Sequence, residues 1–161
     1  MHYAALTGRN SCLEHTLDAF LFCCYTGLRY SDFVSLNEKN IVKMDGKLWL
    51  IFDSVKTGAE VKLPLSLLFE GKALTLLQKY QGKWSSFFSI KNNSSVNKEL
   101  IRIGKLARIN KHFSFHCTSH SKFFYLLNIS ELSILKNVTA NDLETSYILF
   151  LSQLCNIQRT L

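Results

Sequence analysis

The sequence predicts one α+β domain over residues 1–161, mainly helical and with a small three-stranded antiparallel sheet. Three short apolar runs separated by turn signals lie between residues 41 and 65. The segments on either side carry apolar residues at helical spacing instead. A hydrophobic fraction of 47% over 161 residues is enough for one core and leaves little room for a second domain.

The first predicted element is an apolar helix over residues 17–25. Thr26-Gly27 interrupts the apolar run and predicts the end of this helix. Ser31 and Asp32 are residue types that cap helices, so we expect them to begin a short helix that reaches Leu36.

The sheet is predicted from three runs and the turns between them. Ile41–Met44 and Leu48–Phe52 flank Asp45-Gly46, which is a strong signal for a tight hairpin. Val61–Leu65 is the third run. Pro64 lies near its end, where the missing backbone N–H is tolerated.

The remainder of the chain is predicted to be helical. A polar loop over residues 91–95 precedes a helix whose apolar face includes Leu100 and Ile103. Further helices are expected from His116 onwards. The other positions of the helix that follows the polar loop carry cations: Lys98, Arg102, Lys105 and Arg108.

The charge and the cysteines limit the classes of function. A net charge of +7 favours a partner with a negative surface, nucleic acid first. Five cysteines without a C-x-x-C pair indicate reduced thiols in a cytoplasmic protein and give no support for a metal site. No apolar run is long enough for a membrane span, and the N-terminus has no signal-peptide pattern.

The most specific motif is Thr26-Gly27-Leu28-Arg29-Tyr30-Ser31-Asp32, followed by Leu36. A guanidinium placed between a glycine and a helix start can bind two phosphate oxygens at once. The stretch resembles the first arginine motif of tyrosine recombinases, the phage-integrase family, particularly the T-G-L-R-x-S-D form of Bacteroidetes integrases. The resemblance implies that Arg29 binds the scissile phosphate of DNA.

Two further stretches are similar to later motifs of the same family. Val55-Lys56-Thr57-Gly58 resembles the turn between the second and third strands, which implies that Lys56 protonates the leaving 5′ oxygen. The run from His116 to His120 resembles the H-x-x-R-H box, and both histidines match. Ser119 stands where the family has its second catalytic arginine. Loss of such a charged contact typically costs roughly 3–4 kcal/mol in the transition state.

The last stretch that resembles the family contains the expected nucleophile. Thr145-Ser146-Tyr147 resembles the family's T-x-x-Y region, which assigns the attack on phosphorus to Tyr147. A phenol with a pKa of about 10 needs neighbouring cations for this role. Nine positions earlier, where the family has histidine or tryptophan, Val138 donates no hydrogen bond. We therefore expect Ser119 and Val138 to impair the activity.

The resemblance implies a catalytic domain that recombines or integrates DNA through a 3′-phosphotyrosine intermediate, without metal or cofactor. The implied partners are double-stranded DNA and further copies of the chain, as a tetramer on DNA. By the same resemblance, we expect this chain to lack the family's N-terminal core-binding domain. His120 is expected to support the site. The residues expected to contact DNA are Arg29, Lys56, Lys98, Arg102 and Lys105.

Three interpretations remain open from the sequence. The chain is either an active recombinase or a decayed relative that binds DNA without cutting it. A non-enzymatic helical module that binds phosphates through the basic helix at residues 98–108 also explains the charge. It does not explain the order of arginine, hairpin lysine, histidine box and tyrosine.

Overall fold

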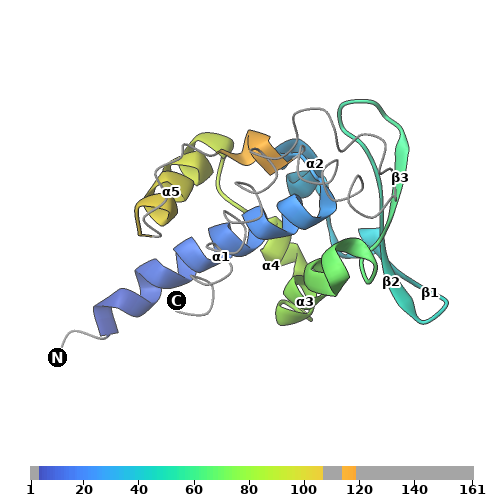
Figure 1. Cartoon of the computed structure of the whole chain (residues 1–161), viewed down its shortest axis with the longest axis horizontal. Helices are drawn as coiled ribbons and strands as arrows, with labels where there is room; N and C mark the ends of the chain where they lie inside the picture. Colours follow the sequence, from blue (N-terminus) through green and yellow to red (C-terminus); the bar gives the residue numbers. More distant parts are fainter. Residues whose placement is uncertain (1–3, 107–113, 119–161) are drawn as a thin grey trace, which may run out of the picture.

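The structure, a computed structural model, describes residues 4–106 and 114–118 (Figure 1). A mainly helical chain with a small antiparallel sheet confirms the predicted fold class. The helices are α1 (Ala4–Thr26), α2 (Tyr30–Ser35), α3 (Lys72–Lys79), α4 (Trp84–Phe88) and α5 (Asn93–Leu106). The strands are β1 (Ile41–Met44), β2 (Lys47–Asp53) and β3 (Glu60–Pro64), and short 3-10 turns cover Glu38–Asn40, Leu68–Gly71 and Phe115–Cys117.

The first helix runs through the middle of the core. Every residue from Leu17 to Thr26 is buried. A helix that is apolar on all sides needs neighbours on all sides, and α3, α4 and α5 pack against α1. The helix contains the predicted segment at residues 17–25 but begins much earlier, at Ala4. Cys23 and Cys24 lie in its buried part, and burial raises the pKa of the Cys23 thiol, which keeps it protonated.

Edge-to-face aromatic contacts join the short helices to α1. The ring centroids of Phe22 on α1 and Phe87 on α4 are 5.5 Å apart. The ring centroid of Phe33 on α2 lies 5.4 Å from that of Phe87. Phe115 packs on Phe20 at 5.7 Å and so brings the 115–117 turn onto the same core. Each of these five rings is fully or almost fully buried, which contributes about 1.5–3 kcal/mol per side chain before entropy is counted.

The three strands form one sheet in the order β1-β2-β3, with both pairs antiparallel. Asp45 and Gly46 both have positive φ, 50° and 74°, as a tight two-residue hairpin between β1 and β2 requires. Leu50 faces Leu63 across the sheet, and both are buried on its inner side. The strand bounds agree with the predicted runs to within one residue, and Pro64 ends β3.

The start of α2 differs from the prediction. The helix begins at Tyr30, and Arg29 occupies the N-cap position without a side-chain cap hydrogen bond. Ser31 and Asp32 therefore lie inside the first turn and do not cap it. Asp32 instead accepts a hydrogen bond from the backbone N–H of Val55, in the turn between β2 and β3. Asp32 thus bonds to a residue 23 positions away, and not to the backbone of its own helix as the sequence suggested.

The polar stretch at residues 91–95 is only partly a loop. Asn92 Oδ1 accepts a hydrogen bond from the Ser95 N–H at 2.9 Å, which caps α5 one turn earlier than predicted. Leu100 and Ile103 are buried, as the helical pattern indicated. The exposed cations of α5 are Lys98, Arg102 and Lys105.

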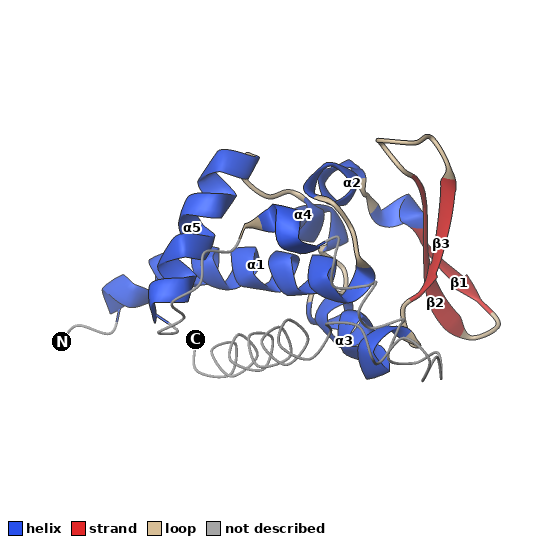
Figure 2. Ribbon diagram, turned by 45° about the horizontal axis from the view of Figure 1, so that its top comes forward, coloured by secondary structure: helices blue, strands red, loops and turns tan. Residues whose placement is uncertain are grey.

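The sheet lies at one end of the molecule, beside the C-terminal end of α1, and α5 lies along the other part of this helix (Figure 2). Helix α2 and the β2–β3 turn thus occupy the same end of α1. No helix within residues 4–106 or 114–118 is long and apolar enough to cross a membrane. Except for the turn that contains His116, the helices predicted beyond that residue lie outside the described residues.

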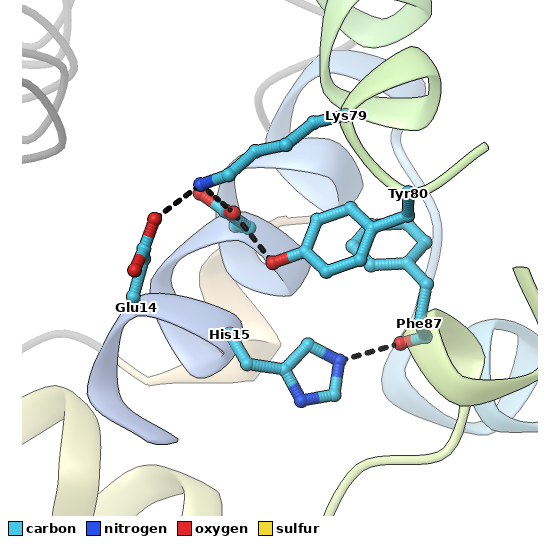
Figure 3. A network of polar contacts seen from close by, with 6 residues as sticks. Glu14, His15, Lys79, Tyr80 and Phe87 are labelled. Carbon is cyan, nitrogen blue, oxygen red and sulfur yellow. Dashed lines mark hydrogen bonds and ion pairs between the residues drawn. The ribbon is translucent and has the colours of Figure 1, made fainter. Parts of the chain in front are cut away.

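A polar network joins α1 to α3 (Figure 3). Asp18, fully buried on α1, accepts hydrogen bonds from Lys79 Nζ at 2.8 Å and from the Tyr80 hydroxyl at 2.6 Å. Lys79 also bonds to Glu14. Burial alone would lower the pKa of Lys79, but the two carboxylates outweigh it and raise it. The network therefore contains a charged lysine compensated within the fold.

Candidate active site

The loop between α1 and α2 presents Arg29. Gly27 has a φ of 70°, and its N–H donates to the carbonyl of Cys23 at 2.8 Å, which ends α1 in a left-handed turn. Leu28 is buried and anchors the loop, whereas Arg29 is exposed. The Arg29 carbonyl accepts the Phe33 N–H at 2.9 Å. Its backbone is therefore fixed on both sides while the guanidinium faces outward.

The turn between β2 and β3 presents Lys56. The Gly58 N–H donates to the Ser54 carbonyl at 2.7 Å, and the Ser54 N–H donates to the Ala59 carbonyl at 2.9 Å. Asp32 holds the same turn from outside, through the Val55 N–H at 2.9 Å. Lys56 follows Val55 and is exposed. The turn that contains Lys56 is thus tied to the helix that follows Arg29.

A 3-10 turn presents His116. The Phe115 N–H donates to Asn97 Oδ1 of α5 at 3.0 Å, and the Phe115 ring contacts Tyr30 edge to face at 5.6 Å. The hydroxyl of Thr118 donates to the carbonyl of Leu28 at 2.7 Å, although 90 positions separate the two residues. The turn that contains His116 is thus bonded directly to the loop that contains Arg29.

Two adjoining pockets share Arg29 as a wall. The first, of about 250 Å³, is lined by Arg29 and His116 together with Tyr30, Ser31, Asn93 and Phe115. The second, of about 240 Å³, lies between the arginine loop and the sheet, and its lining includes Arg29, Asp32 and Ser54. Lys56 comes two positions after Ser54. Arg29 therefore lies between the turn that contains His116 and the side of the sheet where the β2–β3 turn begins.

Tyr30 contributes a neutral group to the first pocket. Burial raises the pKa of the Tyr30 phenol, so it stays protonated. Its hydroxyl donates to the Lys91 carbonyl at 2.8 Å, in the segment before α5. This bond fixes the ring beside Phe115 and His116, which makes Tyr30 a support for the pocket wall.

The predicted site residues divide into two groups. Arg29 and His116 line one pocket, whereas Lys56 lines neither pocket and follows Ser54, a lining residue of the second, by two positions. The expected DNA contacts on α5 are exposed but line neither pocket. The remaining predicted positions lie outside the described residues: Ser119, His120, Val138 and Tyr147.

The sequence interpretation missed two positioning residues. Asp32 belongs to the quoted arginine motif but was assigned the role of a helix cap, because a local partner is the only one that a sequence shows. Thr118 lies inside the histidine box, and its hydroxyl bond to Leu28 had no sequence signal. Both connect segments that are distant in the chain.

The described part of the chain contains no group of three or more histidine, cysteine, aspartate or glutamate side chains that could hold a metal ion. The cationic residues around the two pockets suit an anion as the ligand. A guanidinium and an imidazole that line one pocket can together hold the oxygens of a phosphodiester.

Comparison with known proteins gives one family. The model of the phage integrase family matches residues 3–138 of this chain, which is most of its length. No curated protein and no solved structure matches the chain. The matched range includes Arg29, Lys56 and His116 and ends before Tyr147.

Proposed function

The chain belongs to the phage integrase family, and from this we propose that residues 1–161 form the catalytic domain of a tyrosine recombinase that cuts and rejoins duplex DNA. Arg29 supports the proposal most strongly, because it lines the pocket of His116 and also the pocket beside the lysine turn. A phosphodiester bound there meets cationic groups from three distant segments.

The proposed reaction exchanges one phosphodiester for another. The phenol oxygen of Tyr147 attacks the scissile phosphorus, and the bond from phosphorus to the 5′ oxygen breaks. Lys56 gives a proton to the departing 5′ oxygen, and the phenol proton is lost to solvent or a neighbouring base. Arg29 and His116 stabilise the charge on the non-bridging oxygens, and His120 supports them. Rejoining reverses these steps with a new 5′ hydroxyl, so no cofactor is needed.

Ser119 and Val138 are expected to make the reaction slow. A serine hydroxyl offers one neutral hydrogen bond where a second guanidinium would neutralise charge in the transition state. The loss corresponds to about two to three decades in rate. Tyr147 must also work without a hydrogen-bond donor at position 138.

A covalent trapping assay tests the proposal. The probe is a pool of duplexes with a randomised 30-base-pair core and a nick that lets the cleaved end diffuse away. We expect a small fraction of the full chain to carry DNA after denaturation in detergent, and Ser119→Arg to raise that fraction at least tenfold. Sequencing the trapped DNA would identify the preferred site.

Tyr147→Phe is the matched control, because it removes a single oxygen. Trapping that persists unchanged in this variant would contradict the assigned nucleophile. Trapping at rates usual for efficient recombinases in the wild-type chain would contradict the proposed impairment.

The same proposal covers the partners and the place of action. Double-stranded DNA is the substrate, with Lys98, Arg102 and Lys105 of α5 against its phosphates, and a tetramer of the chain assembles on it in the cytoplasm. Substituting each of these cations by alanine should weaken DNA binding without regard to base sequence and reduce its salt dependence. Light scattering of the chain with and without DNA would test the tetramer.

A decayed relative that binds DNA without cutting it is the second candidate. Ser119 favours it, since the family position for an arginine carries no charge. In that case the affinity for DNA falls steeply as the salt concentration rises. No covalent product then forms with the wild-type chain or with Ser119→Arg.

A further inference from the structure

A third pocket, of about 410 Å³, lies between the β1–β2 hairpin and the α3–α4 segment. It shares no lining residue with the two pockets around Arg29. Its volume falls in the range of sites that take a small ligand or one or two large side chains. The residues that matter for its chemistry are Lys43, Leu48, Ser66, Leu74, Leu77 and Trp84.

Lys43 interrupts the apolar face of the sheet. It pairs with Leu48 across β1 and β2, and residues two positions along each strand, Ile41 and Leu50, are apolar and also paired. The alternation of side chains places Lys43 on the same face of the hairpin as Ile41, but Lys43 is exposed and lies at the rim of the pocket. Because β1 is an edge strand, a lysine here also disfavours addition of another strand.

Ser66 provides an unused hydrogen-bonding group in the pocket wall. Its Oγ is buried and has no hydrogen-bond partner among the residues that the structure describes. Buried hydroxyls are normally paired, since an unpaired one loses its bond to water without replacement. A ligand that carries a peptide or carboxylate group would satisfy it.

The remaining walls define the rest of the ligand. Leu48, Leu74 and Leu77 supply apolar surface, and the Trp84 indole N–H is already used in a bond to the Leu77 carbonyl at 3.1 Å, which leaves its ring as apolar wall. Lys43 and Lys47 bring positive charge, and no aspartate or glutamate lines the pocket. The complementary ligand combines negative charge with an apolar group.

We propose that this pocket binds an acidic peptide segment of a partner protein, with one large apolar side chain between Leu74 and Trp84 and a carboxylate beside Lys43. The segment's backbone reaches the Ser66 hydroxyl. A DNA duplex fits less well, because its phosphates offer no apolar group to fill the pocket. The site lies apart from the proposed recombination chemistry and would recruit the domain to a partner.

The test uses the full, isotope-labelled chain and a fluorescein-labelled pool of hexapeptides, each with two carboxylates flanking a leucine, phenylalanine or tryptophan. In NMR titrations we expect the amide signals of Gly46, Leu48 and Ser66 to shift. Lys43→Glu should weaken binding at least tenfold. Ser66→Leu, which fills the pocket, should weaken it as well, and Lys43→Met serves if the charge reversal unfolds the hairpin.

Lys39→Glu is the matched control, since it makes the same charge change on an exposed residue that does not line the pocket. It should alter the affinity less than twofold. Absence of shifts at 1 mM peptide would overturn the proposal, as would equal weakening by Lys39→Glu and Lys43→Glu. A DNA duplex that shifts the same amides where the peptides do not would assign the surface to nucleic acid instead.

Discussion

Asp18 and Asp32 are both buried aspartates, but they bond to different kinds of partner. Asp18 on α1 is held by the side chains of Lys79 and Tyr80 (Figure 3). Asp32 on α2 is held by a backbone N–H, that of Val55. The first carboxylate is buried and neutralises the charge of a partly exposed lysine. The second positions a turn, and neither Arg29 nor Lys56 forms an ion pair within residues 4–106 and 114–118.

The difference separates a structural region from one that can bind an anion. In the α1–α3 network the lysine charge is already compensated, so it has little left to attract a ligand. Beside Asp32 the fold fixes the backbone of the cationic residues without compensating their charge. Positive charge held in a defined place, without an internal partner, is what a phosphodiester site requires.

The largest expected effect is that of Arg29→Ala. Removing the guanidinium common to both pockets should lower covalent DNA trapping by a factor of about 10²–10³, because in the proposed reaction it stabilises the transition state. The residue is exposed, so the melting temperature should change little. Trapping and thermal unfolding are measured on the same preparation. A large fall in stability with unchanged trapping would place Arg29 with the structural region.

Asp18→Ala should have the largest effect on stability. It leaves Lys79 and Tyr80 without their buried partner, which we expect to cost about 2–3 kcal/mol of unfolding free energy. Denaturation in urea measures this loss. Glu14→Gln is the control on the same lysine, and it should cost less than about 1 kcal/mol because that pair is partly exposed. Similar costs for both variants would show that burial of Asp18 does not set the strength of the network.

Asp32→Ala should lower cleavage more than stability. Without its acceptor the Val55 N–H loses its bond, which costs about 1–2 kcal/mol, and the turn before Lys56 is released. We expect faster hydrogen exchange at Val55 and trapping reduced about tenfold. Asp32→Asn keeps an acceptor oxygen, so it should restore most of the protection of the Val55 N–H and most of the trapping. If Asp32→Asn behaves like Asp32→Ala, the charge of Asp32 matters more than its bond to the turn.

The smallest expected effect is on the pH dependence of stability, and it involves the ion pair between Lys91 and Glu99. Burial opposes ionisation of Glu99, but hydrogen bonds from Lys91 and Thr16 outweigh it and lower its pKa below the ordinary value. Ionised Glu99 therefore stabilises the fold at neutral pH, and this contribution is lost as the pH falls through the lowered folded pKa. Glu99→Gln should flatten the acid limb of a stability curve by less than about 1 kcal/mol, since Lys91 is half exposed. An unchanged acid limb would show that the pair does not contribute.

Local signals in the sequence predict most of the fold. The Asp45-Gly46 turn and the alternating runs beside it fix the strands to within a residue. The arginine motif predicts the exposed Arg29 because a glycine and a helix start are neighbours in the chain. Such features depend on interactions within a few positions.

The rest depends on long-range contacts that no local pattern reports. Asp32 was misassigned because its partner is 23 positions away. The hydroxyl of Thr118 bonds across 90 positions, and Lys79 reaches Asp18 across 61. Buried polar groups take whichever partner the packing brings, so only the folded chain identifies them.

The most direct test of the central claim is a crystal structure of the chain bound to duplex DNA with an orthovanadate or a phosphate at the site. The account predicts one anion contacted by the Arg29 guanidinium and the His116 imidazole, with the Lys56 ammonium within hydrogen-bond distance of a bridging oxygen. An anion held by Arg29 alone, with His116 not in contact and Lys56 directed to solvent, would contradict it.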